Sequence, residues 1–133
     1  MITGAHLLFY SEKPDDDRAF FRDVLGFPSV DIGGGWLIFG LPPAEAAFHP
    51  VDEKEGGEGS QRPHAGPRLL GAELYLMCDD LSAYMKLLEA RNVECAPVHE
   101  ERWGIVTTIP LPSGGAIGLY QPKHPTALGL GAT

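Results

Sequence analysis

The 133 residues, 44% of them hydrophobic and 21% charged, suit one globular domain with a sizeable core. The formal net charge of −8 argues against nucleic acid or an anionic membrane as the partner, because phosphate groups are bound by clustered Lys and Arg side chains. No apolar run approaches about 18 residues and no signal-peptide pattern is visible, so we expect a cytoplasmic protein.

The first half of the chain begins with an apolar segment, residues 2–10, that we expect to be a strand. A helix should follow, because Pro14 suits the first helical turn and the three aspartates after it favour the positive end of the helix dipole. Gly26 is a good terminating residue, since it readily adopts a left-handed backbone. Glycines and prolines then separate three expected strands: 28–32, 36–41 and 45–51.

The second half repeats this order of elements. An apolar run over residues 70–78 predicts a strand, and Asp79 and Asp80 then supply a carboxylate to cap a helix. Asn92, which tolerates the left-handed conformation, is expected to close that helix. The apolar face of the helix is formed by residues at i, i+3, i+4 and i+7: Leu81, Tyr84, Met85 and Leu88. Three further strands are expected: 94–100, 103–111 and 116–121.

The sequence therefore predicts an α+β fold made of two βαβββ modules in one domain. Module 1 covers about residues 1–51, and module 2 covers about residues 69–122. The polar, glycine-rich segment 52–68 between them is expected to be a mobile linker or a lid over a site. Residues 123–133 are expected to form a surface tail.

Three ionisable residues stand on strand positions that should face away from the helices. They are His6 and His49 in the first half and Glu73 in the second, inferred from the alternation of side chains along a strand. If the two sheets curl around a shared concave face, these residues converge. Two imidazoles and a carboxylate suit Fe(II), Mn(II), Ni(II) or Zn(II) with open positions for a substrate. Glu73 is also the candidate catalytic residue.

Each of these residues has a plain structural alternative. His6 could be solvated, His49 could simply end a strand, and Glu73 could pair with Arg68 or Arg102. Scattered His and Glu residues have no ligand spacing of their own. The remaining histidines and three acidic residues are expected to be solvated surface groups: His64, His99, His124, Glu45, Glu100 and Glu101.

Aromatic residues near the proposed cavity suggest binding of a small molecule. The candidate substrate-binding residues are Tyr75, Trp103, Tyr120 and Arg102, with Trp36 also near the cavity. In an acidic chain these rings would suit a small aromatic or cationic compound. Core packing is the alternative, above all for Trp36. No GxSxG, Walker or GxGxxG motif points to another chemistry.

Three segments resemble the vicinal oxygen chelate superfamily, which includes glyoxalase I, the bleomycin-resistance proteins, the fosfomycin-resistance enzymes and extradiol dioxygenases. They are AFFRDVLGF at 19–27, ELYLMCDDLSAY at 73–84 and LPSGGAIGLYQP at 111–122. The resemblance implies a curled mixed sheet around a central cavity with helices outside, and a homodimer. It also implies metal ligands at His6, His49 and Glu73, with Gly118 in place of the common fourth ligand, a glutamate.

The resemblance implies two functions, and a third interpretation stays open. The first is a metal-dependent lyase, isomerase or dioxygenase that chelates a small oxygen-rich substrate on a divalent metal, which acts as a Lewis acid. The alternative is a metal-free protein, similar to bleomycin-resistance proteins, that binds and sequesters a small molecule. The third is a non-catalytic dimer module with a decayed site. Gly118 disfavours mechanisms that use a carboxylate at its position.

Overall fold

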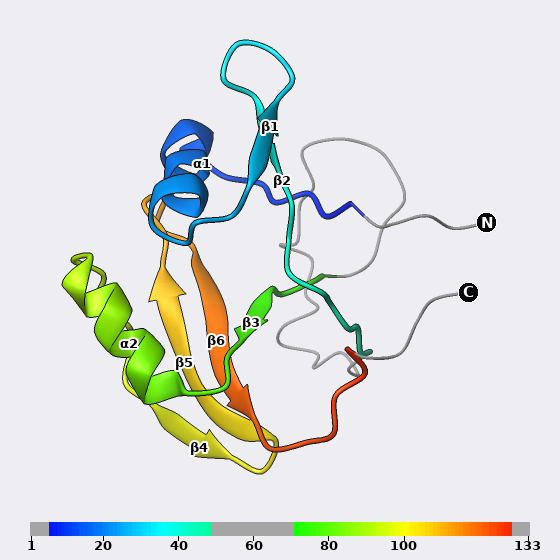
Figure 1. The fold of residues 1–133 in the computed structure, drawn as a ribbon, viewed down its shortest axis with the longest axis vertical. Coiled ribbons are helices and arrows are strands. Elements are labelled where there is room, and N and C mark those ends of the chain that lie inside the picture. Colours follow the sequence, from blue (N-terminus) through cyan, green and yellow to red (C-terminus); the bar gives the residue numbers. More distant parts are fainter. Residues whose placement is uncertain (1–5, 49–70, 129–133) are drawn as a thin grey trace.

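A computed structural model of the chain describes residues 6–48 and 71–128 (Figure 1). The elements are α1 (Pro14–Asp23), β1 (Ser29–Asp31), β2 (Leu37–Phe39), β3 (Tyr75–Met77), α2 (Leu81–Ala90), β4 (His99–Glu101), β5 (Gly104–Pro110) and β6 (Ala116–Pro122). The fold is α+β, as expected. The predicted linker 52–68 and the candidate ligand His49 lie outside the described residues. In the part of the chain that the structure describes, no helix is long and apolar enough to span a membrane.

The second half forms a four-stranded mixed sheet in the order β3-β6-β5-β4. Strand β3 runs parallel to β6, while β5 pairs antiparallel with both β6 and β4. A glycine with φ of 98°, Gly114, turns the chain between β5 and β6. Along the chain the order is β3-α2-β4-β5-β6, which is the order expected for residues 69–122.

Helix α2 begins and ends where its sequence predicts. The Asp80 carboxylate accepts a hydrogen bond from the Ala83 backbone N–H at 3.0 Å, which satisfies one free donor of the first turn. Asn92 has φ of 63°, the left-handed conformation that ends a helix. The helix covers one face of the sheet (Figure 1). Its buried residues pack with those of β5 and β6 in the main core: Leu81, Leu88, Ile109, Ile117 and Leu119.

The first half consists of α1 and the β1-β2 hairpin. Helix α1 starts at Pro14, as predicted, and Gly26 terminates it with φ of 74°. Phe20 and Phe21 of α1 belong to the same core as α2. A hydrogen bond from the Arg91 guanidinium to the Val24 carbonyl also joins the C-terminal ends of the two helices.

Two strands predicted in the first half are absent over the residues that the structure describes, so these predictions are wrong there. Residues 6–10 and 45–48 have no strand, and the rest of both predicted strands lies outside the described residues. An alternating apolar pattern indicates which side chains favour burial, but a strand also needs a neighbour for its N–H and C=O groups. Other strands form as expected but shorter: β3 and β4 have three residues each.

Candidate functional site

Three aromatic rings gather on the sheet face turned away from α2. Tyr75 comes from β3, Tyr120 from β6 and Trp103 from the turn before β5. The ring centroids of Trp103 and Tyr120 are 5.2 Å apart, those of Tyr75 and Tyr120 5.8 Å, and those of Tyr75 and Trp103 6.0 Å. All three pairs meet edge to face, the geometry that the ring quadrupoles favour. We call these three residues the aromatic cluster.

Two glycines allow the rings to lie directly on the sheet. Tyr75 stands opposite Gly118 in the parallel pairing of β3 and β6. A Cβ at Gly118 would overlap the Tyr75 ring, and a Cβ at Gly104 would lie 2.8 Å from Cδ2 of Tyr120. The space that a side chain would need at position 118 is therefore filled by the Tyr75 ring. This gives a physical reason for glycine at the position where the resemblance implies that a glutamate ligand is common.

Glu73 lies next to the aromatic cluster, two residues before Tyr75 and on the same strand face. Burial raises the pKa of Tyr75, and the negative charge of the nearby Glu73 carboxylate raises it further. Glu73 itself is exposed. The structure therefore brings together four of the candidate residues: Glu73, Tyr75, Trp103 and Tyr120.

A second carboxylate reaches the cluster through a histidine. The Tyr120 hydroxyl is 3.0 Å from Nε2 of His124, and this nitrogen is 4.0 Å from Oε2 of Glu45. The other oxygen of Glu45 accepts a hydrogen bond from the Ala127 backbone N–H at 2.7 Å. Burial raises the pKa of Tyr120, and the Glu45 charge adds to the effect. Glu45 therefore links the first half of the chain to the segment that follows β6.

Sequence reasoning missed His124 and Glu45, which were expected to be solvated. His124 lies four residues after Tyr120, just past the end of β6, so its nearness to that ring had a weak local signal. Glu45 had no such signal, because the contact with Ala127 joins residues 82 positions apart in the sequence. Both side chains are partly buried, at 31% exposure for His124 and 21% for Glu45.

The described residues do not by themselves complete a metal site. Across residues 6–48 and 71–128, no three His, Cys, Asp or Glu side chains come together as a possible ligand set. His6 and Glu73 are exposed, and the ring of Tyr75 occupies the space beside Gly118. Because His49 lies outside the described residues, the ligand set His6, His49 and Glu73 stays a prediction.

Two other residues that were expected near the cavity, Trp36 and Arg102, lie outside the aromatic cluster. Trp36 lies in the first half, next to β2, and its ring lies under the Arg18 guanidinium at 4.5 Å from the ring centroid. It is not part of the aromatic cluster. Arg102 is exposed in the turn between β4 and β5, directly before Trp103. Of the two, only Arg102 therefore remains a candidate for contact with a ligand at the cluster.

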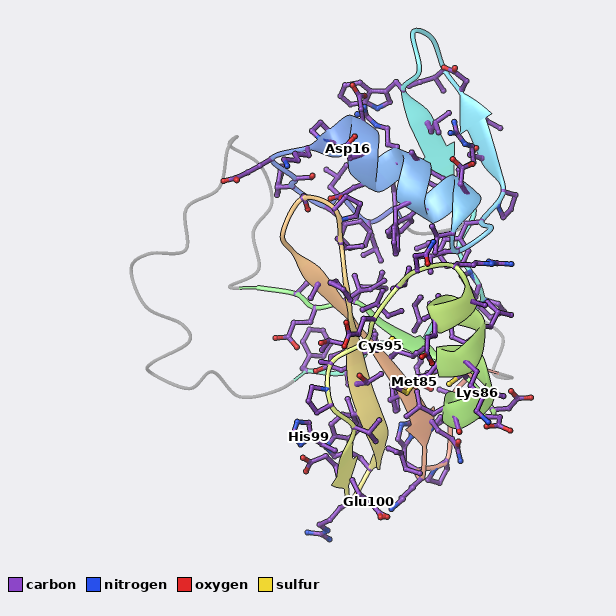
Figure 2. All side chains as sticks on the ribbon, turned by 90° about the vertical axis from the view of Figure 1, so that its left-hand side faces the viewer. Asp16, Met85, Lys86, Cys95, His99 and Glu100 are labelled. Atoms are coloured by element: carbon purple, nitrogen blue, oxygen red, sulfur yellow. The ribbon has the colours of Figure 1, made fainter. Side chains whose placement is uncertain are left out.

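Two surface hollows lie beside α2, apart from the cluster. One, of about 380 Å³, is lined by α2 residues with Val98, Ile105 and Gln121. The other, of about 550 Å³, is lined by Met85 of α2 together with residues 92–95 and Glu89. Figure 2 shows this side, with Met85 on α2 and Cys95 in the segment before β4. None of the candidate site residues lines either hollow.

No protein-family model matches the sequence, and no curated protein is significantly similar to it. Solved structures share its fold. The antibiotic-binding protein TnmS3 from Streptomyces sp. CB03234 is 24% identical with a TM-score of 0.60, and the match covers 92% of this chain and 99% of that one. A lactoylglutathione lyase from Agrobacterium tumefaciens is 18% identical with a TM-score of 0.56, covering 90% and 92%. A glyoxalase/bleomycin resistance protein from Streptomyces sp. CB03234 is 24% identical with a TM-score of 0.51, covering 84% and 93%. The chain therefore has the vicinal oxygen chelate fold of the glyoxalase, bleomycin-resistance and dioxygenase proteins.

Proposed function

We propose that this protein binds and sequesters a small planar aromatic compound on the aromatic cluster. The observation that carries the proposal is the exposure of the rings. Tyr75 and Trp103 remain 40% and 41% exposed although they pack against each other and against Tyr120. Covering exposed aromatic surface with a flat ligand removes apolar area from water, which is favourable at about 25 cal/mol per Å².

The surroundings of the cluster suit this role. Small-molecule sites are mostly apolar and carry a few placed polar groups that fix orientation. Here Glu73 supplies such a group at Tyr75, and His124 supplies one at Tyr120. An aromatic pair contributes about 0.5–1.5 kcal/mol beyond its buried area, so a ligand ring that meets two of these side chains gains from both. That TnmS3 is described as an antibiotic-binding protein supports sequestration as the role of this fold here.

The test is a ligand-binding screen combined with substitution of each of the two tryptophans of the chain. A panel of planar aromatic compounds, antibiotics among them, is screened by thermal shift, because a ligand that binds only the native state raises its stability. Trp103→Ala should abolish the stabilisation by any hit. The matched control is Trp36→Ala, which removes the other indole and should leave it unchanged. Hits that respond equally to both substitutions would contradict the proposal.

A metal-dependent reaction is the second candidate, favoured by the position of Glu73 beside the aromatic cluster. It requires His6, His49 and Glu73 to hold one divalent metal ion. Elemental analysis of the untagged protein, before and after addition of Fe, Mn, Ni, Zn or Co, measures the metal content. One metal per chain that is lost in His49→Ala would support this function. No stoichiometric metal in either protein would contradict it.

We also propose the finer architecture of the protein: two βαβββ modules that curl around a cavity, in a homodimer. Leu7, Leu8 and Phe9 support it, because each is at least half exposed in a segment without a strand partner among the described residues. Pairing of this segment with a sheet edge, in the same or a second copy, would bury these side chains. Light scattering after size-exclusion chromatography measures the mass, and a monomer at micromolar concentration would contradict the dimer.

A further inference from the structure

We propose that the aromatic cluster selects ligands that donate hydrogen bonds, and that His124 and Glu45 set this preference as positioning residues. The inference rests on the proposed binding function and names the chemical class of its ligand. That class is a planar aromatic molecule with N–H or ammonium groups at its edge.

The hydroxyl proton of Tyr120 is held by His124. The backbone carbonyl of Pro125 can only accept a hydrogen bond, so Nδ1 of His124, at 2.7 Å, must carry a hydrogen. In the neutral imidazole the other ring nitrogen then carries none. Nε2 of His124 therefore accepts the hydrogen of the Tyr120 hydroxyl at 3.0 Å. The oxygen of Tyr120 is left with lone pairs only.

A negatively charged carboxylate also lies near Tyr75. Glu73 stands two residues earlier on the same strand face, and its charge acts on the Tyr75 phenol. A carboxylate has no hydrogen to donate, so it can only accept one. The Tyr120 oxygen thus offers lone pairs, and each phenol of the aromatic cluster has a negatively charged side chain nearby, Glu73 for Tyr75 and Glu45 for Tyr120.

Arg102, exposed directly before Trp103, is a cation that could favour a ligand carboxylate instead. With the Tyr120 proton held by His124, the three rings retain two hydrogen-bond donors, the Trp103 indole N–H and the Tyr75 hydroxyl. Lys123, next to His124, is engaged with Glu100, whose Oε1 is 3.2 Å from the ammonium. A ligand carboxylate at the Tyr120 oxygen would meet lone pairs and negative charge. An N–H or ammonium group would be accepted by them, and hydrogen bonds in which the donor or the acceptor is charged are the stronger kind.

Glu45 acts through its position. One oxygen accepts from the Ala127 N–H at 2.7 Å, which holds the segment that carries His124 against the first half of the chain. The other oxygen lies 4.0 Å from Nε2 of His124. Glu45 therefore keeps the imidazole beside the Tyr120 hydroxyl. Loss of this carboxylate should weaken the preference for donors while the aromatic surface stays intact.

The experiment compares three probes of one shape: 2-naphthylmethylammonium, its N,N,N-trimethyl analogue and 2-naphthoate. The first is a cation with N–H donors, the second a cation without them, and the third an anion. Binding is followed by NMR at the indole N–H signal of Trp103, assigned by its survival in Trp36→Phe. Titrations are made at one pH, about 8. We expect the amine to bind at least about tenfold more tightly than the naphthoate, with the trimethyl analogue between them.

The variants connect this preference to the residues. His124→Phe keeps a ring beside Tyr120 but removes the acceptor, and should lower the amine preference severalfold; His124→Gln retains an acceptor and should restore part of it. Glu45→Gln should lower the preference as well. Asp16→Asn is the matched control for charge. It lies exposed on α1, at the far end of the molecule from the β4-β5 turn (Figure 2), and should leave the preference unchanged.

Each outcome is decisive. Equal or tighter binding of naphthoate, with the Trp103 signal shifting, would overturn the donor preference and leave the binding function standing. Equal binding of the amine and its trimethyl analogue would also overturn it, since charge alone would then explain the preference. No shift of the Trp103 signal with any probe would overturn the binding function and this inference together.

Discussion

The two halves of the chain were expected to have the same order of elements, yet their apolar residues differ in burial. In the second half, Ile109 of β5 and Leu119 of β6 are 0% and 1% exposed beneath α2. In the first half, Val30 of the β1-β2 hairpin is 62% exposed. The hairpin has no third strand among the described residues, whereas β6 has a neighbour on each side. Apolar character shows where burial is favourable, but strand neighbours and a covering helix decide where it happens.

This difference also places the candidate site. All three rings of the aromatic cluster come from the second half, where parallel and antiparallel pairing fix the register of the strands. The first half contributes Glu45, which reaches the cluster only through His124. A rigid sheet therefore positions the rings, and the longer-range contacts adjust the polarity around them.

The largest expected effect on stability comes from truncating a buried apolar side chain of the second half. An exposed apolar side chain of the first half is truncated for comparison. Leu119→Ala should lower the free energy of unfolding by about 2–5 kcal/mol, because it leaves a cavity in the core. Val30→Ala should cost no more than about 0.5 kcal/mol, because its side chain is already in water. Urea unfolding measures both. A cost of several kcal/mol at Val30 would contradict the exposed hairpin and indicate that a second copy covers it.

The next effect is overpacking at Gly118. Gly118→Ala should destabilise the protein by about 1–3 kcal/mol, because the added Cβ overlaps the Tyr75 ring. In a Tyr75→Ala background the same substitution should cost much less, since the overlapping ring is gone. A double-mutant cycle by urea unfolding measures this coupling. Additive effects of the two substitutions would show that Tyr75 does not lie over Gly118 in solution.

Removal of a helix-capping side chain should lower the stability by a smaller amount, and this loss should again differ between the two halves. Asp80→Ala should cost about 1 kcal/mol, because it removes the side-chain acceptor at the start of α2. The matched control, Asp79→Ala, removes the neighbouring carboxylate without removing a cap. In the first half, Lys13→Ala should change little, since the side chain at the N-cap of α1 makes no capping hydrogen bond. Equal losses at Asp79 and Asp80 would contradict the capping role.

The smallest expected effect is the pH dependence of stability contributed by Tyr84. Burial beside the second-half core raises the pKa of its phenol in the folded state above the ordinary tyrosine value of 10.0. The resulting stabilisation is fully present below the pKa of the unfolded chain and is lost as the pH rises through the folded pKa. Tyr84→Phe should therefore reduce the loss of stability above about pH 10, measured by urea unfolding across that range. An unchanged alkaline loss would contradict this burial effect.

Local features of the sequence were sufficient for much of the second half. The capping carboxylate of Asp80 and the left-handed Asn92 act within a few residues of their own position, so they fix the limits of α2. Alternation along β3 and β6 assigned Tyr75 and Tyr120 to one face and Leu119 to the other, as the packing confirms. The same pattern over residues 6–10 predicted a strand that is absent, because no local signal reveals a missing neighbour.

The sequence by itself therefore determined the α+β class, the helix limits and which strand residues share a face, because these depend on contacts between near neighbours. Only the tertiary structure decided that Tyr75 covers Gly118, that Trp103 joins the two tyrosines, and that Glu45 reaches His124. Those contacts depend on strand register and on chain segments far apart in sequence. A one-residue change of register would move every side chain to the opposite face, and the pattern of residues along one strand does not specify its partner.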